Sequence, residues 1–85
     1  MLGQILILYT MNLSEVKIKT NCIVKNIKIE DENEKIRLME LGLISGAKIF
    51  VQHKSIFKKT LLVVFNSCCF TLKENVAKNV VVEYA

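Results

Sequence analysis

The chain has 85 residues, which is enough for one domain with a thin core. Hydrophobic residues make up 52% of it, and this share excludes an intrinsically disordered protein. The formal net charge of +4 arises from 12 basic and 8 acidic residues that are interspersed along the chain. Such a mild excess suits solubility or an acidic partner surface and is weak evidence for nucleic-acid binding.

Cysteine usage and the N-terminus indicate the compartment. Cys22, Cys68 and Cys69 are odd in number and two are adjacent, which argues against a disulfide framework. The first residues lack the basic start and the cleavage site of a secretory signal, and the apolar run 5–9 is too short to cross a bilayer. We therefore expect a reduced, cytoplasmic protein.

Residues 1–10 differ from the rest because they are almost wholly apolar and uncharged. We interpret them as an N-terminal tail that precedes a domain spanning residues 11–85. The alternative is an extra edge strand, since an isoleucine-rich run of this kind pairs readily with another strand.

The first strand of the domain is expected at 22–29. This segment is rich in β-branched residues, and Ile23, Ile27 and Ile29 would form the apolar face of a half-buried strand.

One helix follows, with a start and a stop signal. Asp31 is placed as its N-cap, with Glu34 three residues later as in a capping box. Gly42 ends the helix in the left-handed conformation, so that Leu43 packs back on Leu38. The expected apolar stripe comprises Ile36, Met39 and Leu43, with Glu40 at the same spacing, and is widened by Leu38 and Leu41.

Four more strands are expected after Gly46, at 48–53, 60–65, 68–72 and 79–84. The segment 60–65 is apolar on both faces and is expected to be central in the sheet. Asn66-Ser67 would form a tight hairpin turn, and residues 73–78 a second short turn. Five short strands and one helix predict a mainly β protein, folded as a small, strongly bent barrel.

The sequence offers little catalytic chemistry. His53 is the single histidine, and neither a glycine-rich phosphate loop nor a Gly-x-Ser-x-Gly motif is present, so we expect no enzyme and no cofactor. His53 is assigned to the strand face of Ile49 and Val51 as a structural residue. Cys68 and Cys69 would point to opposite faces of a strand as buried small hydrophobes, and could not share one metal ion.

A metal site is therefore not expected. A thiolate site for iron or zinc would need Cys22 or His53 from another strand, which leaves weak transition metal binding open.

The loop around Phe57 allows two interpretations. Lys54, Lys58 and Lys59 flank this aromatic residue, as in single-stranded nucleic-acid binding, although no RNA-binding signature accompanies them. An exposed Ile56-Phe57 tip would equally serve a protein contact.

Residues 37–47, Arg-Leu-Met-Glu-Leu-Gly-Leu-Ile-Ser-Gly-Ala, resemble the FeoA family pattern Arg-Leu-x-x-Leu-Gly-Leu-x-Pro-Gly. Residues 72–80, with Ala77 five residues after the leucine, resemble that family's closing stretch, and 13–20 its opening segment. Ser45 stands in place of the family's proline, and Ile36 in place of a common second arginine. Thr20-Asn21 replaces a glycine, and asparagine tolerates the left-handed conformation well.

The resemblance implies an SH3-like barrel and a non-enzymatic accessory role in ferrous iron transport. The implied partner is the cytoplasmic G domain of the FeoB membrane transporter, so the membrane would be met only through that partner. Position and resemblance select Arg37, Glu40, Leu43, Ile44, Ile56, Phe57 and Lys58 as contact residues, and Gly42, Gly46, Asp31 and Ala77 as structural residues. The alternatives are a nucleic-acid module, which we do not expect, and an interaction domain like the C-terminal module of metal-dependent repressors.

Overall fold

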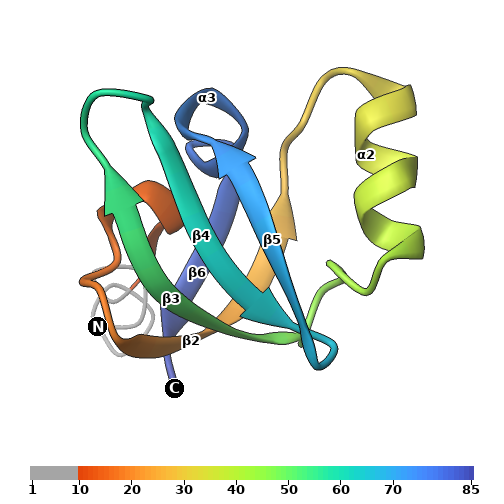
Figure 1. Ribbon diagram of the computed structural model, residues 1–85. Helices are drawn as coiled ribbons and strands as arrows, with labels where there is room; N and C mark the ends of the chain where they lie inside the picture. The colour runs from red at the N-terminus through yellow and green to blue at the C-terminus, as the bar shows by residue number, and fades with distance from the viewer. Residues whose placement is uncertain (1–9) are drawn as a thin grey trace.

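The computed structural model describes residues 10–85, which form one curled sheet with a helix beside it (Figure 1). In chain order the elements are β1 (Thr10–Asn12), the 3-10 helix η1 (Leu13–Glu15), β2 (Thr20–Ile27), α2 (Glu32–Glu40), β3 (Lys48–Ser55), β4 (Thr60–Phe65), β5 (Cys68–Lys73), α3 (Glu74–Ala77) and β6 (Val80–Tyr84). Within this range no helix is long and apolar enough to cross a membrane.

The sheet has the strand order β1-β6-β2-β3-β4-β5, and every neighbouring pair is antiparallel. β2 pairs with β3 from Thr20 to Ile23 and with β6 from Cys22 to Ile27, so it links the two parts of the curled sheet. The prediction of a mainly β, strongly bent barrel with one helix is confirmed, and β1 adds a sixth strand. Thr10 opens β1 opposite Glu83, whereas the rest of the expected tail lies outside the described residues.

The core is supplied by alternate residues of the strands. β4 lies between β3 and β5, as its apolar sequence predicts, and buries Leu61, Val63 and Phe65 on one face. The ring of Phe65 stacks on that of Phe70 in β5, with 4.3 Å between the ring centroids. Burial of large side chains of this kind is the main favourable term for so small a domain.

The predicted inward face of β2 was wrong in its first half. Cys22 and Val24 are fully buried, whereas Ile23 is only half-buried. A bulge at Lys25 shifts the register with β6, because Val24 pairs with Val82 and Asn26 with Val81. One extra residue reverses the alternation of the side chains, so inward positions change from even to odd numbers along the strand.

A second bulge explains the position of His53. Ile49 and Val51 are buried as predicted, but His53 is exposed and does not share their face. The register of β3 with β4 shifts between Val51 and His53, which leaves Gln52 as the extra residue. The prediction that His53 shares the strand face of Ile49 and Val51 was therefore wrong.

The helix α2 buries only part of its expected stripe. Leu38 is the buried residue of the helix, and Leu41 packs partly against the core. Ile36 and Met39 are 49% and 42% exposed, so their assignment to the core was wrong. Figure 1 shows the reason, because the helix stands beside the barrel instead of lying flat on it.

The end of α2 has the backbone geometry that the sequence predicts. The N–H of Leu43 donates to the carbonyl oxygen of Leu38 at 2.9 Å, and that of Gly42 to Met39 at 3.1 Å. These are the two hydrogen bonds of a Schellman motif, which needs a left-handed residue at Gly42, where φ is +111°. Leu38 and Leu43 both enter the core cluster, as predicted.

The connections between the strands include turns and one short helix. Asn66 and Ser67 have φ of +52° and +61°, which gives the predicted two-residue hairpin turn. Residues 73–78, expected as a turn, contain the short helix α3, in which Ala77 is fully buried. The left-handed residue before β2 is Lys19, with φ of +59°, and not Asn21.

The three cysteines are free, and their burial differs from the prediction. Cys68 and Cys69 are both exposed at the start of β5, directly after the hairpin turn, whereas Leu72 near the end of the same strand is buried. Cys22 is buried, and burial raises the pKa of its thiol to about 11.

The first prediction compares the two glycines with positive φ, Gly42 and Gly46. An alanine at either position adopts a left-handed backbone at a cost of roughly 1–2 kcal/mol. A Cβ at Gly42 would also lie 3.0 Å from Cβ of Asn66, whereas nothing lies within 4 Å of a Cβ at Gly46. Gly42→Ala should therefore lower the free energy of unfolding more than Gly46→Ala, measured by urea denaturation. Equal losses would contradict the close contact with Asn66.

The second prediction concerns thiol accessibility. Ellman's reagent should modify Cys68 and Cys69 rapidly in the folded protein, and Cys22 only after unfolding in urea. Cys22→Ala should leave the rapid phase unchanged and remove the urea-dependent one. Rapid modification of Cys22 in the folded protein would show that β2 is not packed as described.

The third prediction follows from the raised pKa of Cys22. The unfolded chain loses this proton near the ordinary pKa of about 8.5, whereas the folded protein holds it up to about 11. The buried thiol therefore contributes its full stability below the pKa of the unfolded chain, and this contribution is lost as pH rises through the pKa of the folded protein. The urea midpoint of the wild type should fall more steeply than that of Cys22→Ala over this range. If the urea midpoints of the two proteins fall in parallel as pH rises, the raised pKa of Cys22 is contradicted.

Candidate functional site

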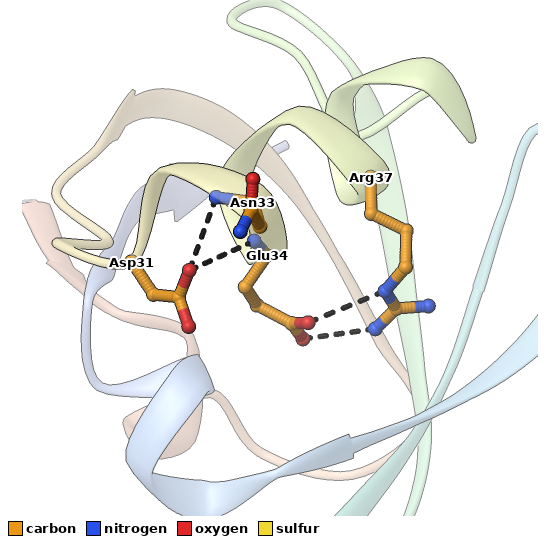
Figure 2. A network of polar contacts seen from close by, with 4 residues as sticks. All are labelled: Asp31, Asn33, Glu34 and Arg37. Carbon is orange, nitrogen blue, oxygen red and sulfur yellow. Dashed lines mark hydrogen bonds and ion pairs between the residues drawn. The ribbon is translucent and has the colours of Figure 1, made fainter.

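The N-terminus of α2 is fixed by one carboxylate. The Asp31 Oδ1 accepts hydrogen bonds from the backbone N–H of Asn33 at 3.0 Å and of Glu34 at 3.3 Å (Figure 2). These bonds satisfy two of the donors that a helix leaves free in its first turn. The predicted N-cap at Asp31 is confirmed.

Glu34 does not complete the predicted capping box. Its carboxylate instead pairs with Arg37 through two parallel bonds, from Nη2 to Oε1 at 2.9 Å and from Nε to Oε2 at 3.2 Å (Figure 2). The hydrogen bond and charge of Glu34 raise the pKa of Arg37 above its usual value. Two-pronged pairing holds the planar guanidinium in one orientation at the surface.

An open cleft of ≈ 720 Å³ separates the first half of α2 from β5 and α3, and we call it the α2–β5 cleft. Its polar lining comes from Glu30, Asp31, Glu34 and Arg37 on the helix side, and from Thr71, Lys73, Asn75 and Asn79 on the other. Apolar surface is added by Ile29, Leu72 and Val76. The lining is thus a set of carboxylates, amides and cations around a small apolar area.

The outward face of α2 carries apolar side chains. Ile36 and Met39 are three residues apart and lie on the same side of the helix as Glu40, opposite the buried Leu38. Ile44, just beyond the helix, is 47% exposed. We call the exposed set Ile36, Arg37, Met39, Glu40 and Ile44 the α2 surface.

The predicted contact residues fall into two separate groups. Arg37, Glu40 and Ile44 are exposed around α2. Leu43, however, is fully buried as part of the Schellman motif, so its selection as a contact residue was wrong. The second group comprises Ile56, Phe57 and Lys58, which are exposed on the loop between β3 and β4. Figure 1 shows this loop and α2 on opposite sides of the barrel.

The residues selected as structural keep the backbone in place. Gly42 and Gly46 both have positive φ, Asp31 caps α2, and Ala77 is buried.

Several residues of the site escaped sequence reasoning. Ile36 and Met39 follow the same spacing as a buried stripe, so periodicity alone could not show that they face solvent. The residues of β5 and α3 that line the cleft lie more than thirty positions from α2, and only the tertiary fold brings them to it.

Residues 10–85 contain no group of three His, Cys, Asp or Glu residues placed to hold a metal ion. Cys69 Sγ lies 3.9 Å from Oε1 of Gln52, and Cys22 is inside the core.

The chain is similar to known proteins of one family. A family model described as the FeoA domain matches residues 11–84. The FeoA protein from Chlorobium tepidum is 31% identical, with a TM-score of 0.81 over 87% of this chain and 70% of that one. FeoA from Stenotrophomonas maltophilia, solved in complex with zinc, is 33% identical, with a TM-score of 0.72 over 86% of this chain and 89% of that one.

The Stenotrophomonas protein is described as an SH3 domain protein and a candidate activating factor for ferrous iron transport. A manganese-dependent transcriptional repressor has the same fold, with a TM-score of 0.81 at 16% identity over 89% of this chain and 42% of that one. No curated protein matches the chain. The SH3-like barrel is confirmed, and the chain belongs to the FeoA family, which is associated with ferrous iron transport.

Proposed function

We propose that this protein is a non-enzymatic accessory factor of ferrous iron transport that binds the cytoplasmic G domain of a FeoB-type membrane transporter. The contact is made by the α2 surface. Family membership supports the link to ferrous iron, and the exposed face of α2 supports a protein contact. The protein acts in the cytoplasm, where that G domain lies.

The observation that carries the proposal is the position of Ile36 and Met39. A domain with so small a core gains stability from every apolar side chain it can bury, yet these two are largely exposed, as is Ile44 just beyond the helix. Single exposed hydrophobic residues are common, but several together on one helix face are typical of a binding surface.

Charged residues surround this apolar set, which fits the composition of protein interfaces. Glu40 lies on the same side of the helix as Ile36 and Met39. Arg37, which Glu34 orients, lies at the edge of this face toward the α2–β5 cleft. Interfaces of this kind draw most of their free energy from a few apolar or arginine anchors that neighbouring groups shield from water.

The chemistry of the α2–β5 cleft also supports a binding role. Its lining holds carboxylates, amides, a hydroxyl, a guanidinium and an amine, which together can bind polar groups of a partner. The cleft also separates α2 from the barrel, so that a partner can approach the helix from more than one side.

The fourth prediction tests the α2 surface against a matched site. Ile36→Ala should weaken binding to the isolated G domain by about 1–3 kcal/mol, because an apolar anchor is lost. Ile18→Ala is the control, since Ile18 is 50% exposed and belongs to the segment between η1 and β2. That segment lies on the other side of the barrel from α2 (Figure 1). Arg37→Glu should also weaken binding. Calorimetric titration gives all four affinities.

The same titrations separate this function from nucleic-acid binding. A nucleic-acid module would bind an oligonucleotide with log affinity falling linearly as log salt rises, with a slope of roughly −0.7 to −0.9 per phosphate contacted. Equal affinity of the G domain for the Ile36→Ala and Ile18→Ala variants would remove the case for the α2 surface. Steeply salt-dependent oligonucleotide binding without G-domain binding would contradict the accessory role.

A further inference from the structure

The tip of the loop between β3 and β4 has an unusual composition for its position. Ile56 is 87% exposed and Phe57 is 100% exposed. Turn positions normally hold glycine, proline, asparagine, aspartate or serine, each for a backbone reason that isoleucine and phenylalanine do not meet. Departures from local preference are typical of functional positions.

The loop nevertheless has a defined shape. Ser55 and Thr60 form the last pair of β3 and β4, and the N–H of Lys58 donates to Oγ of Ser55 at 3.3 Å. Lys59 adopts a left-handed conformation, with φ of +52°, and brings the chain back into β4. The backbone therefore presents Ile56 and Phe57 together at the end of the hairpin, which protrudes from one end of the barrel (Figure 1).

Lysines surround this apolar tip. Lys58 and Lys59 follow it directly, and Lys73 lies opposite Thr60 in the sheet. Lys54 donates from Nζ to the carbonyl oxygen of Ser14 at 2.8 Å, which holds its charge on the same end of the barrel. We call Lys54, Lys58, Lys59 and Lys73 the basic collar.

The acidic residues at this end are already engaged. The N–H of Glu74 donates to the carbonyl oxygen of Lys59, and its carboxylate pairs with Lys78 at 3.3 Å. The carboxylate of Glu15 accepts from the N–H of Asn12. Both carboxylates keep their charge, but the four lysines of the basic collar outnumber them. The surface around the tip therefore carries a net positive charge, which complements an anionic surface and not a basic one.

We propose that Ile56 and Phe57 insert into the interfacial region of an anionic lipid bilayer, with the basic collar bound to the lipid headgroups. Apolar and aromatic side chains enter the boundary between headgroups and acyl chains, and lysines extend their aliphatic stems along it with the amine in water. Basic residues at the surface are attracted to anionic lipids. The protein thus contacts the membrane directly and not only through a transporter.

The geometry favours a bilayer over a protein partner at this loop. A protein partner would have to take the fully exposed Phe57 into a pocket whose rim also accommodates the surrounding lysines and excludes water. A bilayer surrounds an inserted tip on every side. The α2 surface, on the opposite side of the barrel, stays free when the loop is inserted (Figure 1).

The first experiment uses the absence of tryptophan from the sequence. Phe57→Trp supplies one fluorophore at the tip, and its emission should shift to the blue on addition of vesicles of phosphatidylcholine with phosphatidylserine. The control is Tyr84→Trp, since Tyr84 is 42% exposed and is the last residue of β6. The C-terminal end of β6 lies at the other end of the barrel from the β3–β4 loop (Figure 1). The control should not shift. An unchanged Phe57→Trp emission, or an equal shift in both variants, would overturn the proposal.

The second experiment separates insertion from electrostatic adsorption. In vesicle sedimentation, Phe57→Ala should bind about tenfold or more weakly than the wild type, and Lys58→Gln about fivefold more weakly. Both variants keep residues 1–9, so the differences measure the loop. If Lys58→Gln weakens vesicle binding but Phe57→Ala does not, the protein adsorbs to the headgroups without insertion, and the proposal is overturned. The proposal is also overturned if Phe57→Ala weakens binding to the G domain and not to vesicles, because the loop would then be a protein contact.

Discussion

The hydrogen bond from Leu43 to Leu38 is the contact on which the placement of α2 depends. It closes the helix, and the left-handed backbone of Gly42 turns the chain so that Leu38 and Leu43 both reach the core. The turn between β4 and β5 reinforces this end, because Nδ2 of Asn66 donates to the carbonyl oxygen of Leu41 at 3.2 Å. The helix is thus held firmly at its C-terminal end, while its first half stands across a cleft from the barrel. Its outward face remains available because no described element covers it.

The barrel keeps two unlike surfaces apart. On one side, α2 exposes Ile36 and Met39, with the oriented Arg37 at the edge of this face toward the cleft, which is suited to a folded protein partner. At one end, the hairpin of β3 and β4 offers Phe57 on a narrow tip within a basic collar, which is suited to a soft, anionic surface. In the proposed function, the two surfaces together would let the protein bind the transporter's cytoplasmic domain next to the membrane. The two contacts then support one another, because binding at one raises the effective concentration at the other.

The sequence predicted those features that a single residue determines through its own backbone or side chain. Asp31 caps a helix because its carboxylate accepts N–H groups, Gly42 stops it because it tolerates positive φ, and Asn66-Ser67 forms a hairpin turn for the same backbone reason. The faces of β2 and β3 failed where Lys25 and Gln52 are inserted as bulges, because a bulge is a property of two paired strands and leaves no mark on either alone. Helical spacing shows which residues of α2 share a side of the helix, but it does not show which side packs against the barrel. The far wall of the cleft, from β5 and α3, depends on the tertiary fold alone.

The central claim is that the protein has two separate binding surfaces, and an amide chemical-shift titration of the isotope-labelled protein tests it most directly. Addition of the isolated G domain should shift or broaden the signals of Ile36, Met39 and Ile44 and leave those of the β3–β4 loop unchanged. Addition of anionic vesicles should affect Ile56, Phe57 and the basic collar and leave α2 unchanged. If both additions perturb the same residues, or if the G domain perturbs only the loop, the protein has a single binding surface and the account is contradicted.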